Sequence, residues 1–171
     1  MLDYDQPDQA ADEDETSSTY LTFDLGGQTL GVEVRFVREI LDLQKITRLP
    51  NAPIEVQGVI DVRGVSVPIL DLRTRLGVGG IEVEGDQRIV VLELGGQRRA
   101  VGVFADRVRN VDVIPRANIE PVPTEGLGGW DTSSLMGLAR NAEDLIVLID
   151  IDRILGTPAS EIDLDAGYGF F

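Results

Sequence analysis

Apolar and polar residues alternate along most of the chain with a period of two, which is typical of β-strands that bury one face. The clearest early example is residues 20–34, YLTFDLGGQTLGVEV, where the alternation runs on both sides of Gly26-Gly27. Glycine accepts positive φ without steric cost, as a two-residue hairpin turn requires. The pattern therefore predicts a β-hairpin. Residues 35–41 contain apolar residues at spacings that fit either a helix or a kinked strand.

This strand pattern occurs twice in the sequence. Residues 58–77, GVIDVRGVSVPILDLRTRLG, align with 137–156, GLARNAEDLIVLIDIDRILG, and the hairpin at 20–34 aligns with IVVLELGGQRRAVGV at 89–103. Each long copy contains an outgoing segment, a polar turn, an apolar return strand and a short helical end before glycine. An internal repeat of this kind predicts a duplicated architecture.

Two halves of about 70 residues, each with some five short strands, predict an all-β protein made of two small barrels. Halves of this size bury little apolar surface alone, so we expect them to share a core. The expected divisions are a disordered acidic tail at 1–17, a first barrel at 18–85, a second at 86–156 and a tail at 157–171. Short helical segments complete the prediction.

Charge is concentrated at the two ends of the chain. The formal net charge is -15, but residues 1–17 hold seven acidic and no basic residues, and 156–171 hold three acidic and no basic residues. These blocks of like charge indicate solvated tails and argue against nucleic acid or anionic lipid as partners. The N-terminus has no signal-peptide pattern, and no apolar run could span a membrane. We therefore expect a cytoplasmic protein.

Composition lowers the prospect of an enzyme. Cysteine and histidine are absent and Lys45 is the only lysine, which removes thiol nucleophiles, the usual neutral-pH base and the commonest metal ligands. Asp71 and Asp150 occupy equivalent places in the repeat, and we expect them to bind backbone amides where a strand ends. The sequence predicts no catalytic residue, metal or cofactor.

Several segments together resemble the CheW family of bacterial chemotaxis coupling proteins. They are FDLGGQTLGVEV with Val37-Arg38-Glu39-Ile40, ITRLPNAP, GVIDVRGVSVPILDLR, IVVLELGG with VGVFADRV, and LIVLIDIDRIL, and they cover 20–155. The resemblance implies two SH3-like five-stranded β-barrels packed together. It also implies a non-enzymatic adaptor recruited to receptor arrays.

The resemblance further implies the partners and their sites. One partner is the regulatory domain of the histidine kinase CheA, matched by Val37, Glu39 and Gly58. The other is the cytoplasmic tip helices of chemoreceptors, matched by a set of groove residues. That set is Arg63, Val65, Val67, Val90 and Val91. Other CheW copies in arrays are further partners.

One departure from the family pattern and two alternatives stay open. The family usually has Asn-Leu-Arg-Gly where this chain has Asp61-Val62-Arg63-Gly64, and an aspartate side chain can only accept hydrogen bonds there. The first alternative is a CheW-like scaffold of a pilus, gliding or gene-regulatory chemosensory pathway. The second, less favoured, is a barrel that binds a small ligand in the crevice between the halves.

Overall fold

The computed structural model describes residues 17–79, 85–95, 99–125, 128, 131–141 and 144–155. The expected N-terminal tail, 1–17, lies outside these residues except for Ser17, which begins the first strand. The expected C-terminal tail, 157–171, lies wholly outside them.

The structure contains the predicted hairpin and shows which conformation residues 35–41 adopt. The hairpin consists of β1 (Ser17–Leu25) and β2 (Gln28–Glu33), and its turn residues Gly26 and Gly27 have φ of 58° and 81°. Next comes a 3-10 turn, η2 (Val34–Phe36), followed by the strand β3 (Val37–Asp42). The kinked strand is therefore confirmed. The first half ends with β4 (Val56–Val62), β5 (Val65–Leu70) and the helix α2 (Leu72–Leu76).

The second half repeats this plan, as the sequence repeat predicts. Its elements are β6 (Arg88–Leu94), β7 (Arg99–Ala105), β8 (Arg107–Pro115), η3 (Arg116–Asn118), β9 (Ile119–Glu120), β10 (Leu135–Asn141), β11 (Asp144–Ile149) and α3 (Ile151–Leu155). Asp71 accepts the backbone N–H of Arg73 at 3.0 Å, and Asp150 accepts that of Arg153 at 3.2 Å. The role expected for these two aspartates is therefore confirmed.

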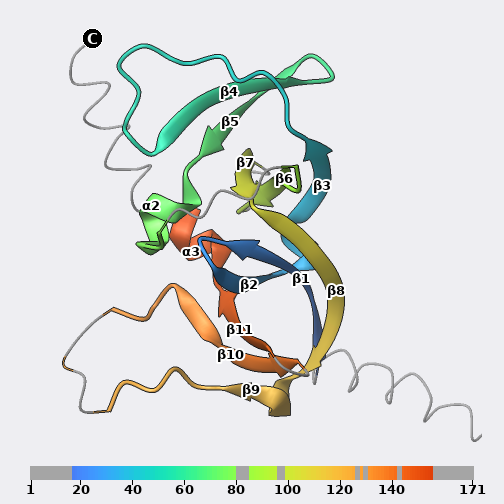
Figure 1. Ribbon diagram of the computed structural model, residues 1–171, viewed down its shortest axis with the longest axis vertical. Helices are drawn as coiled ribbons and strands as arrows, with labels where there is room; N and C mark the ends of the chain where they lie inside the picture. Colours follow the sequence, from blue (N-terminus) through green and yellow to red (C-terminus); the bar gives the residue numbers. More distant parts are fainter. Residues whose placement is uncertain are drawn as a thin grey trace, which may run out of the picture.

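The strands form two sheets, one above the other in Figure 1, and each sheet takes strands from both halves. One sheet has the order β8-β1-β2-β11-β10-β9 and the other β3-β6-β7-β5-β4. The all-β prediction is confirmed. The sheets do not follow the sequential division into 18–85 and 86–156, because the hairpin of each half joins the return strands of the other through the parallel pairs β2–β11 and β7–β5.

Burial follows from this exchange. The largest apolar cluster includes Phe23 of β1 and Leu92 of β6, together with Leu72 of α2 and Ile154 of α3. It therefore joins both sheets and both short helices, and the expected shared core is confirmed. Each sheet also contributes one smaller apolar cluster, around Leu148 in the first sheet and around Ile69 in the second. Within the described residues, no helix has the length and apolar character needed to cross a membrane.

Candidate functional site

A shallow groove of about 150 Å³ lies on the sheet that contains β3 to β7, beside the smaller core cluster that includes Val67 and Val91. We call it the valine groove. Val65 and Val67 of β5 line it together with Val91 of β6 and Val62 of β4. Val65 is 58% exposed and presents apolar surface to solvent, whereas Val67 and Val91 are only 3% and 1% exposed and lie at the bottom of the groove. The remaining lining residues are Arg38, Glu39 and Arg63.

A paired charge forms one edge of the valine groove. Arg63 donates from Nη1 to Oε1 of Glu39 at 3.0 Å and from Nη2 to Oε2 at 2.5 Å. This hydrogen bonding lowers the pKa of the Glu39 carboxyl and raises that of the Arg63 guanidinium. The Arg63 side chain is 70% exposed and that of Glu39 only 20%. The arginine is therefore the accessible member of the pair.

The hairpin turn explains why Arg63 is placed at this edge. Arg63 has φ of 50° and Gly64 has φ of 84°, so both turn residues lie in the left-handed region. The Asp61 carboxylate accepts the backbone N–H of Gly64 at 2.9 Å. This contact needs only an acceptor, so the aspartate that departs from the family pattern fits the turn.

The structure brings together five of the eight residues that the resemblance assigns to partner contacts. They are Glu39, Arg63, Val65, Val67 and Val91, all in the valine groove. The grouping also joins the two expected sites, because the resemblance assigns Glu39 to the kinase and Arg63 to the receptor.

The other three assigned residues lie elsewhere. Val90 is 0% exposed and belongs to the central core, since neighbouring residues of a strand point to opposite faces. Val37 is half-buried and packs against the same core. Gly58 is buried and has φ of 145°. None of these three residues lines the valine groove.

Two groove residues are not among those that the sequence indicates. Arg38 lines the groove beside Glu39, and Val62 pairs with Val65 across the hairpin. The hairpin signal could have identified Val62, because residues that flank a two-residue turn face each other. The alternation in 35–41 could not identify Arg38, because a strand and a helix would place it differently.

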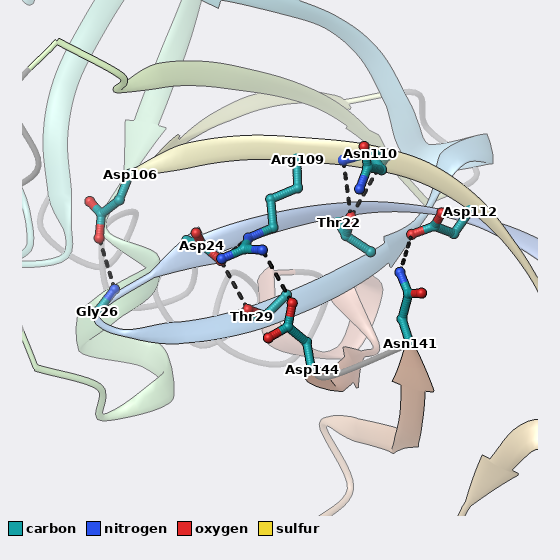
Figure 2. A network of polar contacts seen from close by, with 10 residues as sticks. All are labelled: Thr22, Asp24, Gly26, Thr29, Asp106, Arg109, Asn110, Asp112, Asn141 and Asp144. Atoms are coloured by element: carbon teal, nitrogen blue, oxygen red, sulfur yellow. Dashed lines mark hydrogen bonds and ion pairs between the residues drawn. The ribbon is translucent and has the colours of Figure 1, made fainter.

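The duplicated fold offers a second face to compare with the valine groove. In the β10–β11 hairpin, Asn141 and Asp144 occupy the closing pair that Val62 and Val65 occupy in β4–β5. This pair is thus apolar on one face and polar on the other. Figure 2 shows that polar side chains of this second face form hydrogen bonds and ion pairs with one another.

Arg109 of β8 is the centre of that polar face. Its Nε donates to Asp24 at 2.7 Å and its Nη1 to Asp144 at 3.3 Å, while Thr29 donates to Asp24 at 2.9 Å (Figure 2). Thr22 also exchanges two 3.1 Å hydrogen bonds with the backbone of Asn110. The two faces share a backbone plan, but the pair of residues next to the hairpin turn is apolar in the first and polar in the second.

The groove is suited to recognition. Apolar side chains can bury the apolar stripe of a partner, and the exposed guanidinium can bind a carboxylate at its edge. Among the described residues, no group of three acidic side chains is placed to hold a metal ion. A duplicated β fold with an apolar groove edged by an ion pair defines a protein-docking module of the scaffold type.

The chain belongs to the CheW family. The family model described as the CheW-like domain matches residues 19–159, nearly all of the described chain. This match confirms the resemblance seen in the sequence and, with it, the class of chemotaxis adaptors and scaffolds.

Named relatives agree with the family model. The chain is 33% identical to the chemotaxis protein CheW of Klebsiella aerogenes over 138 residues, which cover 81% of each chain. It is 32% identical over 155 residues to the protein FrzA of Myxococcus xanthus, covering 88% of this chain and 94% of FrzA. Among solved structures, the scaffolding protein TtCheW from Thermoanaerobacter tengcongensis matches with a TM-score of 0.71 and 28% identity, over 82% of this chain and 88% of that one.

Proposed function

We propose that this protein is a non-enzymatic cytoplasmic adaptor that couples chemoreceptors to the histidine kinase CheA. Its valine groove binds the cytoplasmic tip helices of a receptor, and the region of Val37, Glu39 and Gly58 supports contact with the CheA regulatory domain. The observation that carries the proposal is the gathering of Glu39, Arg63 and three assigned valines in one groove. Val65 and Arg63 are its exposed members.

The receptor contact follows from the chemistry of the groove. A helix from a receptor tip would bury an apolar stripe against Val65 and its neighbours, as amphipathic helices do in hydrophobic grooves. Arg63 would hold an acidic side chain of that helix, because its guanidinium is 70% exposed and its planar fork matches a carboxylate.

One ion pair links the two proposed contacts, since Glu39 is assigned to the kinase and Arg63 to the receptor. Glu39 is bonded to Arg63, so a partner that engages one member changes the surroundings of the other. Two ligands linked in this way have a coupling free energy, typically about 1–3 kcal/mol. Recruitment of kinase to receptor arrays then follows from raised local concentration.

A matched pair of valines provides the test. Val65 in the groove is 58% exposed and Val111 on β8 of the other sheet is 59% exposed. We expect Val65→Glu to abolish capture of a receptor cytoplasmic fragment and Val111→Glu to retain it, with both variants folded by circular dichroism. Equal capture by the two variants would overturn the groove assignment.

The same variants separate the two partners. Capture of the CheA regulatory domain should be reduced by Glu39→Ala, and we expect Val65→Glu to weaken it less than it weakens receptor capture. The reverse pattern would exchange the two assignments.

The similarity to FrzA keeps a chemosensory pathway other than flagellar chemotaxis as the alternative setting for the same adaptor role. Capture assays with receptors from neighbouring genes distinguish the settings.

A further inference from the structure

A separate cavity of about 350 Å³ lies beside the sheet that contains β3 to β7, and it shares no residue with the valine groove. Its walls come from the end of β1, the connection between β3 and β4, the start of α2 and the end of β7. The apolar members of the wall are Leu25, Leu43, Ile46, Leu72 and Phe104. A volume of this size lies within the range of small-molecule sites, which starts at about 300 Å³.

Arg73 of α2 is the cation of this cavity, and a buried carboxylate holds it in place. Asp106, 2% exposed, accepts from Nη2 of Arg73 and also from the backbone N–H of Gly26 at 2.9 Å, the second contact being drawn in Figure 2. The Arg73 side chain remains 25% exposed and lines the cavity. A guanidinium has five N–H donors, so donors are left after the ion pair.

The charges around the cavity favour an uncharged ligand. Asp106 neutralises Arg73, and Asp71, which also lines the cavity, adds a further negative charge. The Asp71 oxygens already accept from the backbone N–H of Arg73 at 3.0 Å and from the Thr74 hydroxyl at 2.9 Å. An added carboxylate would meet this excess of negative charge. An added ammonium would lose its hydration on entering the cavity, for oxygens that already accept hydrogen bonds.

Three glutamines supply groups that suit a neutral polar ligand. Gln44, Gln57 and Gln87 line the cavity beside its apolar wall. An amide side chain both donates and accepts hydrogen bonds, so it pairs with carbonyl and amide groups as well as with water.

From these contacts we infer a second binding site, which takes an uncharged ligand with an apolar or aromatic body and a carbonyl or amide group. The body packs between Leu43, Ile46 and Phe104, and the carbonyl oxygen accepts from Arg73. The inference goes beyond the adaptor function, since neither receptor nor kinase is needed to test it.

Three related probes test the inference on the full chain at about pH 6, where an α-amino group is protonated. They are N-acetyl-phenylalaninamide, which is neutral, N-acetylphenylalanine, which carries a carboxylate, and phenylalaninamide, which carries an ammonium. Each is titrated while the backbone amide resonances of the protein are followed by NMR. We expect the neutral probe to shift the amides of Ile46, Gln57 and Phe104 with a dissociation constant of about 1 mM, as small fragments typically show. The charged probes should bind at least about tenfold more weakly.

Substitutions at the two apolar surfaces locate the binding. Leu43→Trp at the 49% exposed mouth of the cavity should weaken the neutral probe at least about tenfold by occupying its volume. Val65→Trp in the valine groove should leave it unchanged. Shifts centred on the groove, equal binding of all three probes, or no shifts at the solubility limit would each overturn the inference. Resonance mapping in the unsubstituted chain distinguishes these outcomes even if Leu43→Trp does not fold.

Discussion

Gly58 gives the sharpest quantitative prediction, because its backbone and its surroundings both exclude a side chain. Its φ is 145°, and a Cβ added there would lie 2.3 Å from the carbonyl oxygen of Thr47. That oxygen already accepts the backbone N–H of Val59 at 2.8 Å, and the N–H of Thr47 donates to the Val59 carbonyl at 2.8 Å. The Thr47 backbone is therefore fixed from both sides and cannot easily move away.

The expected cost of Gly58→Ala combines two effects. Left-handed backbone costs an alanine about 1–2 kcal/mol, and forced displacement of packed atoms costs about 1–3 kcal/mol more. We expect a loss of about 3 kcal/mol in the free energy of unfolding. For a chain of this length that corresponds to a fall of about 10 °C in melting temperature, measured by urea unfolding and differential scanning calorimetry.

Gly77 provides the matched control. It has φ of 66° and a Cβ there would meet no atom within 4 Å, so Gly77→Ala should cost only the backbone strain, about 1 kcal/mol. Should Gly58→Ala prove no more destabilising than Gly77→Ala, the steric argument is wrong. A fully stable Gly58→Ala that has lost CheA binding would instead make Gly58 a contact residue.

Two further predictions concern the ion pair at the groove. Reversing both charges, Glu39→Arg with Arg63→Glu, should recover part of the stability and kinase binding that each single reversal loses, and strictly additive losses in a double-mutant cycle would contradict the pairing. Because the folded-state pKa of Glu39 lies below its ordinary 4.5, its stabilising effect is present above pH 4.5 and is lost as pH falls through the lower folded value. The difference in unfolding free energy between the native chain and Glu39→Gln should therefore vanish in acid, and a difference that grows in acid would refute it.

Local structure and the repeat could be predicted because short-range chemistry determines them. Gly26-Gly27 and Arg63-Gly64 both form turns with positive φ, as hairpins of this length require. Asp71 and Asp150 cap the two helices that follow equivalent strands. Each of these features depends on residues within a few positions of one another.

Strand partners could not be predicted from the same information. A proline within a strand indicates a sheet edge, yet Pro68 belongs to β5, which lies between β4 and β7. The proline is tolerated because β5 pairs with β7 only through Ile69 and Leu70, beyond the position of the missing N–H. Each hairpin could pair with the return strand of its own half or with that of the other half. The two halves have similar strand patterns, so the sequence does not decide between these pairings.

The same limit applies to the site. Resemblance places Val90 and Val91 together in the groove, but they point to opposite faces of β6, and only Val91 lines it. The phase of an alternating strand becomes certain only when its neighbours are known, since a shift of one residue exchanges the two faces. The ion pair between Glu39 and Arg63 joins β3 to the β4–β5 turn, and this contact spans segments that the sequence alone does not bring together.

Duplication supplies two equivalent faces, and the proposed docking surface uses only one of them. A duplicated β unit begins with two similar faces, and two apolar grooves on one small protein would allow partners to bind in two registers. On the polar face Arg109 links Asp24 to Asp144, so the charges are satisfied within the protein. On the other face the equivalent hairpin positions are Val62 and Val65, with Arg63 accessible. We therefore expect a partner with an apolar stripe and an acidic edge to bind at Val65 and Arg63, because the equivalent hairpin positions of the second face are polar and paired.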